Sequence, residues 1–174
     1  MNLLELLKKV TIKLLNFHNH PCIEMEESIQ IHYINALTLV AISDNDISAL
    51  EIEYIKLFID SFGLSPDLLD TFIEFGKNPD KKIVLDMMQS INNKNIRYNL
   101  LVDCMMMAYI DGDYNDKEKT IIKQYYTMFK IDKDEADDLE SIFYHFYHQN
   151  SYIYLDYIDI ELFRYLFDYY DMEM

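Results

Sequence analysis

One acidic segment occurs twice in this chain, and the repeat limits the folds that the sequence can adopt. Residues 41–51 align with residues 108–118 without a gap, which pairs Asp44 with Asp111, Asp46 with Asp113 and Glu51 with Glu118. Apolar positions beyond both segments also coincide, as in the pairs Ile55 and Ile122, Phe58 and Tyr125, and Phe62 and Phe129. An internal repeat indicates that one supersecondary unit is present in two copies.

Apolar residues recur at helical spacing around both acidic segments. The expected helices span residues 3–17, 24–42, 48–62, 66–75, 80–91, 96–108, 115–129 and 132–146, with one more after residue 150. Ser48 with Glu51, and Asn115 with Glu118, match the capping box that begins a helix. Gly63 and Gly76 are expected to end the helices that precede them.

The predicted fold class is all-α: a helical bundle built from two similar helix-loop-helix halves, with extra N- and C-terminal helices. Only three glycines and three prolines are present, too few for the turns of a many-stranded β protein. The expected organisation is an N-terminal helix and linker over 1–23, a duplicated domain over 24–149 with halves 24–92 and 93–149, and a C-terminal helix over 150–174. Pairing of the halves about a pseudo-twofold axis would bring the two acidic loops close together.

The two terminal segments leave alternatives open. The first helix is basic and amphipathic, so it suits either docking on the core or lying on a membrane surface. The segment 150–174 is acidic and rich in tyrosine, a residue that suits interfaces, and it packs either on its own domain or against a partner. A homodimer through this helix is one form of the second alternative.

The formal net charge of −16 disfavours nucleic acid and anionic lipid as partners. It suits a basic protein partner, a cation or simple solubility. Charged residues interrupt the leucine-rich N-terminus, so we expect no export signal, no inserted membrane segment and a cytoplasmic location. Cys22 and Cys104 lack metal-site spacing and are expected to be buried thiols. No phosphate loop, nucleophile elbow or zinc-protease motif is present, so the sequence predicts no enzymatic activity.

The acidic loops do not match a calcium-binding EF-hand. Such a loop needs a glycine at position 6 and a bidentate glutamate at position 12. Counted from Asp111, these positions hold Asp116 and Ile122, and counted from Asp44, position 12 holds Ile55. A better match is the pattern Ala-x-x-Asp-Gly followed by a glutamate six residues after the glycine, formed by Ala108, Asp111, Gly112 and Glu118.

With its second copy, this pattern resembles the TerB-like (tellurite-resistance B) family over about residues 24–146. The resemblance implies an all-helical, non-enzymatic protein linked to tellurite and other stress resistance, which acts as an adaptor and binds a divalent metal. The implied metal ligands are Asp44, Asp46, Glu51, Asp111, Asp113 and Glu118. Carboxylates suit Ca²⁺, Mg²⁺ or Mn²⁺. The first copy departs from the pattern, because Asn45 replaces the glycine. Helix capping alone is the alternative role for these acidic residues.

Other candidate features have ordinary alternatives. His145 and His148 form either a partial metal site or a solvated face, and His18 and His20 are expected to be loop residues. The run Met105-Met106-Met107 makes either a pliable binding surface or core filling. Two functions therefore remain: a cation-binding stress-response adaptor, or an acidic blocking protein of the toxin-immunity or DNA-mimic type that acts through surface charge. A metal-dependent hydrolase lacks any identifiable base or nucleophile.

Overall fold

The computed structural model describes residues 20–43, 46–93, 96–110 and 114–149, with side-chain detail in the last range up to Ser141. Seven α-helices and no strands occur in these ranges: α2 (Glu27–Ala41), α3 (Ala49–Ser61), α4 (Leu68–Lys77), α5 (Lys81–Asn93), α6 (Arg97–Tyr109), α7 (Asp116–Phe129) and α8 (Lys133–Gln149). The all-α prediction is therefore confirmed. None of these helices combines the length and the apolar character that crossing a membrane requires.

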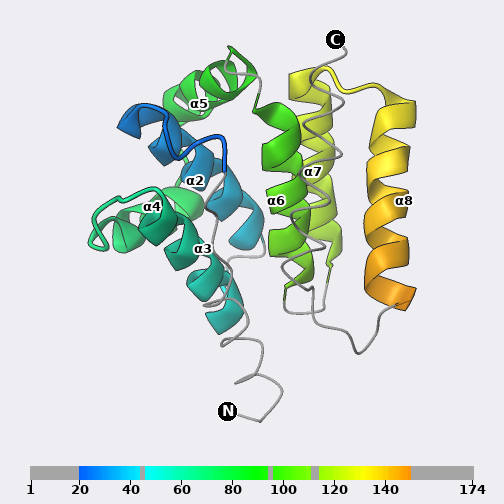
Figure 1. Cartoon of the computed structure of the whole chain (residues 1–174), viewed down its shortest axis with the longest axis horizontal. Helices are drawn as coiled ribbons and strands as arrows, with labels where there is room; N and C mark the ends of the chain where they lie inside the picture. Colours follow the sequence, from blue (N-terminus) through cyan, green and yellow to red (C-terminus); the bar gives the residue numbers. More distant parts are fainter. Residues whose placement is uncertain (1–19, 44–45, 94–95, 111–113, 150–174) are drawn as a thin grey trace.

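Helix α2 is the centre of the fold. It packs against α4, α5 and α6 and also contacts α3 and α7 (Figure 1). Ile34, Ala36 and Leu37 are fully buried, because a helix surrounded on several sides has no solvated face. Tyr125 of α7 donates a hydrogen bond from its hydroxyl to the Ala36 carbonyl oxygen at 2.9 Å, which ties α7 to the middle of α2.

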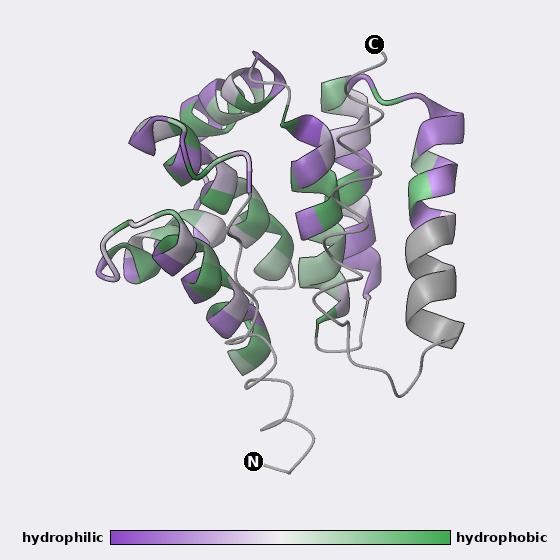
Figure 2. Ribbon diagram, in the orientation of Figure 1, coloured by the Kyte–Doolittle hydropathy of each residue, from purple (hydrophilic) through white to green (hydrophobic). Residues whose placement is uncertain are grey.

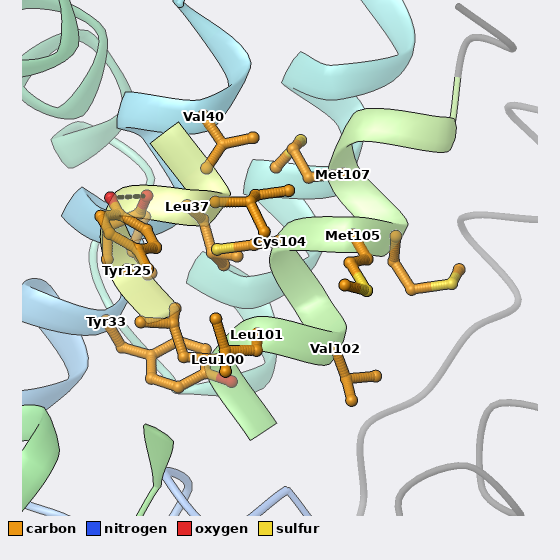
Figure 3. Close-up of a cluster of buried hydrophobic side chains, with 14 of the residues drawn as sticks. Tyr33, Leu37, Val40, Leu100, Leu101, Val102, Cys104, Met105, Met107 and Tyr125 are labelled. Carbon is orange, nitrogen blue, oxygen red and sulfur yellow. Dashed lines mark hydrogen bonds between the residues drawn. The ribbon is translucent and has the colours of Figure 1, made fainter. Parts of the chain in front are cut away.

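Helix α6 is the second buried helix. Every residue from Tyr98 to Tyr109 is buried, and α6 packs on both α2 and α7. Figure 3 shows Leu101 and Cys104 of α6 on the side that faces Leu37 of α2. The repeat places α2 and α6 at equivalent positions, so the equivalent helices of the two predicted halves are in direct contact.

Local signals set most helix ends as the sequence predicted. Ser48 and Asn115 cap α3 and α7, and Asp132 forms a third such pair with Glu135 at the start of α8. Gly63 follows α3 with a φ of +70°, in the left-handed region that glycine adopts without strain. These ends depend on residues at most four positions apart, which is why sequence patterns identify them.

Gly76 corrects one prediction. It does not end its helix, because α4 continues to Lys77. A β-carbon at Gly76 would lie 2.7 Å from Ile42 Cδ1 and 3.0 Å from Thr38 Cγ2. The glycine therefore allows the backbone of α4 to approach the end of α2 closely.

Candidate functional site

Glu51 and Glu118 occupy matching positions at the starts of α3 and α7. The Ser48 backbone N–H donates to Glu51 Oε2 at 2.6 Å, and the Glu51 N–H donates to Ser48 Oγ at 3.2 Å. The Asn115 N–H donates to Glu118 Oε2 at 2.8 Å, and Asn115 Oδ1 accepts from the Glu118 N–H at 3.1 Å. Both predicted capping boxes are confirmed, and the repeat extends to hydrogen-bond geometry.

These two glutamates are buried, with 4% and 3% of their surfaces exposed. A buried carboxylate needs donors or positive potential, and the first turn of a helix supplies both through unpaired N–H groups and the helix dipole. The capping contacts therefore account for the placement of each carboxylate. In Figure 1 the first turns of α3 and α7 both lie toward the lower edge of the view.

Of the other four predicted ligands, the structure describes one and leaves three outside the described ranges. Asp46 is exposed, and its Oδ1 accepts a hydrogen bond from the Ile47 N–H at 2.9 Å. Asp44, Asp111 and Asp113 lie outside the described residues. Within the described part of the chain, no three histidine, cysteine or acidic residues are grouped as a metal site. The cation site thus stays a prediction. The side chains of His145 and His148 also lie outside the described set.

A buried polar cluster joins the turn before α2 to α6, and the sequence reasoning missed it. His20 Nε2 lies 3.0 Å from Asp103 Oδ2. The Tyr33 hydroxyl donates to the same oxygen at 2.6 Å, and the Tyr54 hydroxyl reaches Oδ1 at 3.5 Å. Asp103 is fully buried and His20 is 2% exposed. The three neighbours supply donors to a carboxylate that has no access to water.

Backbone contacts determine the protonation of His20. The Cys22 N–H donates to His20 Nδ1 at 3.0 Å. Since an N–H group can only donate, Nδ1 is an acceptor without a proton, so the neutral ring carries its proton on Nε2 and donates it to Asp103. Both ring nitrogens are therefore engaged. This histidine–aspartate pair cannot serve as a general base, and its role is to hold the turn against the core.

Two sequence signals pointed to this cluster. Asp103 is the only charged residue among the twelve buried residues of α6, and the repeat aligns it with Ala36. A carboxylate within an apolar helix requires a buried partner. His20 was expected to be an ordinary loop residue. Its backbone lies outside the helices, but its side chain lies in the core against Phe58 and Phe62, with ring-centroid distances of 5.7 and 5.1 Å.

A second polar cluster lies beside the second acidic loop. The hydroxyls of Tyr114 and Tyr126 are buried and have no hydrogen-bond partner among the described residues. Burial raises the pKa of both phenols, and the nearby negative charge of Glu140 raises each pKa further. The Tyr114 ring packs on Tyr109 at 4.6 Å between centroids. These phenols are therefore neutral at ordinary pH, so they add no negative charge beside the loop.

The comparisons with known proteins agree with this architecture. The family model of the tellurite resistance protein TerB matches residues 30–141, which is more than half of the chain and reaches from α2 into α8. No curated protein and no solved structure matches the chain. The chain belongs to the TerB family of tellurite resistance proteins.

Proposed function

We propose that this TerB-family chain is a non-enzymatic stress-response adaptor that binds a divalent cation through its two acidic loops. The observation that carries the proposal is the matched placement of Glu51 and Glu118, each buried at the start of a helix that follows an acidic loop. The full ligand set would be Asp44, Asp46, Glu51, Asp111, Asp113 and Glu118.

The donor set fits a hard cation. All six side chains are carboxylates, which suit Ca²⁺, Mg²⁺ or Mn²⁺ rather than a soft metal. Capping engages the Oε2 atoms of Glu51 and Glu118, and an ionised carboxylate has lone pairs on two oxygens. A bound cation would neutralise charge in the loops of a chain with a formal net charge of −16.

The experiment is a calorimetric titration of metal-stripped protein with Ca²⁺, Mg²⁺ and Mn²⁺. The variant Glu51→Gln/Glu118→Gln separates the two roles, because glutamine also closes a capping box but is a weaker cation ligand. We expect saturable binding by the native chain, loss of binding in this variant and in Asp111→Asn/Asp113→Asn, and little change in thermal stability without metal.

A matched control removes two carboxylates elsewhere. Asp70→Asn/Asp138→Asn changes the net charge equally at two exposed helix positions, and we expect it to bind the cation as the native chain does. Absence of binding heat, together with a melting temperature that metal leaves unchanged, would refute the cation role. Equal weakening in the control would instead indicate general charge attraction.

The blocking-protein alternative is favoured by the first half of α8. Asp134, Asp137 and Asp138 are exposed there, as is Asp132 just before the helix, and Figure 2 draws this part of α8 mostly in the hydrophilic colour. A basic partner held by such a face would bind less tightly as salt rises, because screening weakens exposed charge pairs. Substituting Asp134 and Asp138 by asparagine would weaken that complex without changing cation binding, which separates the two functions.

A further inference from the structure

The turn before α2, residues 20–25, is held by hydrogen bonds that converge on the side chains of His20 and Gln30. The Cys22 backbone N–H donates to His20 Nδ1 at 3.0 Å, and the Ile23 N–H donates to the His20 carbonyl oxygen at 3.0 Å. Gln30 of α2 donates from Nε2 to the carbonyl oxygens of Cys22 and Ile23. Of these hydrogen-bonding groups, the imidazole is the one that titrates between pH ~5 and ~8. Mild acid can therefore act on this turn through His20.

Three helices face the His20 ring. Asp103 of α6 places Oδ2 at 3.0 Å from Nε2, and the Tyr33 hydroxyl of α2 lies 3.2 Å from the same nitrogen. Helix α3 contributes two phenylalanine rings against the imidazole and the Tyr54 hydroxyl, which reaches the other oxygen of Asp103. Phenols ionise only near pH ~10. Asp103 is therefore the charged group that the described helices present to the ring near neutral pH.

Protonation of His20 conflicts with the hydrogen bond that the turn makes to its ring. The second proton goes onto Nδ1, because Nε2 already carries the first. The Cys22 N–H points at Nδ1, and two N–H groups cannot hydrogen-bond to each other. Asp103 favours the imidazolium through its charge, but it contacts Nε2 and leaves the two N–H groups opposed at Nδ1. The charged ring therefore fits beside Asp103 only after the backbone at Cys22 moves away.

We propose that His20 is an acid-sensitive switch, in which a proton on Nδ1 ends the hydrogen bond with the Cys22 N–H and loosens the turn. Gln30 then holds the turn without the imidazole, so the turn opens more often as pH falls from ~7 to ~5, where histidine titrates. The two thiols report the two regions, because Cys22 lies in the turn, Cys104 lies within α6, and both are fully buried. The switch opens one edge of the domain and does not depend on cation binding by the acidic loops.

His32 of α2 is a second histidine, and protonation has no such consequence there. Its Nδ1 lies 3.1 Å from Ser90 Oγ, and a hydroxyl can either donate or accept a hydrogen bond. The contact with Ser90 therefore persists when Nδ1 gains a proton. Burial lowers the pKa of His32, and the nearby charge of Asp86 raises it in opposition. His32 thus provides a matched control, since it gains a proton in acid without losing its partner.

Thiol labelling of the full chain tests the proposal, because the chain has two cysteines and peptide mapping by mass spectrometry separates them. The reagent is 4,4′-dithiodipyridine, a disulfide that thiols attack in mild acid. The rate of each cysteine in the urea-unfolded chain at the same pH corrects for thiol ionisation. We expect the protection of Cys22 to fall from pH ~7 to ~5 by up to about tenfold per pH unit, the slope of one linked proton. The protection of Cys104 should stay constant over the same range.

Two glutamine variants identify the histidine that is responsible. His20→Gln removes the titratable ring and keeps an amide donor for Asp103, so the protection of Cys22 should no longer depend on pH in this range. His32→Gln is the control and should keep the native pH dependence. The proposal is overturned by Cys22 protection that is level with pH in the native chain, by an unchanged slope in His20→Gln, or by loss of the slope in His32→Gln. Equal deprotection of Cys22 and Cys104 would also overturn it, because acid would then unfold the whole domain.

Nitrogen-15 NMR of the native chain covers the case in which His20→Gln fails to fold. The Nδ1 chemical shift of His20 identifies its tautomer, and the exchange rate of the Cys22 amide proton, relative to an unstructured peptide, reports its hydrogen bond. We expect the Nε2–H tautomer at pH ~7.5. The Cys22 amide should lose its protection at the pH at which His20 gains its second proton. A charged His20 ring beside a Cys22 amide that is still protected would contradict the switch.

Discussion

The imidazole of His20 and the carboxylate of Asp103 meet in the core, with 3.0 Å between Nε2 and Oδ2, although 83 residues separate them in the chain. The contact fixes the turn before α2 onto α6. Gln30 strengthens the same turn, because its side-chain Nε2 donates to the carbonyl oxygens of Cys22 and Ile23 at 2.9 and 3.1 Å. The turn that precedes α2 is therefore held in place by polar contacts inside an apolar core.

The first prediction concerns this cluster. His20→Ala removes a hydrogen-bond donor from a fully buried carboxylate, and the loss of a hydrogen bond to a charged group costs about 1.5–3 kcal/mol. Tyr33→Phe removes a 2.6 Å bond to the same carboxylate and should cost about 1.5–3 kcal/mol. Urea unfolding at neutral pH measures both losses.

Tyr54→Phe is the matched control for Tyr33→Phe, because it removes the same atom from a longer contact of 3.5 Å. We expect it to cost less than Tyr33→Phe. Equal losses from the two tyrosines would show that Asp103 does not depend on the shorter bond, and native-like stability of His20→Ala would contradict the anchoring role.

Sequence reasoning found the local features of this protein and missed the distant ones. The capping pairs of Ser48 and Asn115 involve atoms three residues apart, so the sequence contains all of their geometry. Asp103 binds a histidine from a segment far earlier in the chain, and the glycine at 76 is needed because of Thr38 in the last turn of α2 and Ile42 just after it. Such contacts exist only after helices pack. Among the predicted ligands, the positions of Glu51 and Glu118 follow from the sequence, because capping fixes each of them within its own first helical turn.

Removing the hydroxyl group should have opposite effects on the free energy of unfolding at two adjacent tyrosines of α7. The Tyr125 hydroxyl donates to the Ala36 carbonyl at 2.9 Å, so Tyr125→Phe should destabilise the fold by about 1 kcal/mol. The Tyr126 hydroxyl is buried and has no partner in the part of the chain that the structure describes, so Tyr126→Phe should stabilise the fold by about 1 kcal/mol or more, since an unpaired desolvated group is removed. Thermal and urea unfolding of the two variants provide the comparison. Destabilisation by Tyr126→Phe would show that its hydroxyl has a partner.

Stability should fall at alkaline pH. Burial raises the pKa of Tyr125 and of the Cys104 thiol, and burial with the charge of Glu140 raises the pKa of Tyr126. Unfolded thiols and phenols ionise near pH ~8.5 and ~10, so above these values the folded state binds more protons than the unfolded state. The free energy of unfolding is then constant at neutral pH and decreases as pH rises through this range toward the folded pKa values.

The measurement for this pH dependence is urea unfolding at a series of pH values, with phenolate absorbance followed in parallel. The free energy of unfolding of Tyr126→Phe should fall less per pH unit than that of the native chain, because the variant lacks one of the phenols whose ionisation is coupled to unfolding. A native chain whose unfolding free energy is level from pH ~8 to pH ~11 would contradict the prediction.

The last prediction tests the close approach of α4 to α2. Gly76→Ala places a methyl 2.7 Å from Ile42 Cδ1, and overpacking of this kind costs about 1–3 kcal/mol, only partly offset by the better helix propensity of alanine, worth about 0.5–1 kcal/mol. Ile42→Val deletes that Cδ1 atom and alone costs about 0.5–1.5 kcal/mol. If the clash is the cause, the double variant should lose less stability than the sum of the single losses, a coupling of about 0.5–3 kcal/mol for residues in contact.

Gly63→Ala is the control, because its cost comes from a φ of +70° with no atom within 4 Å of the new methyl. Ile42→Val should therefore leave the cost of Gly63→Ala unchanged. Strict additivity at Gly76 in urea unfolding would show that the Ile42 side chain is not the atom group that the new methyl displaces.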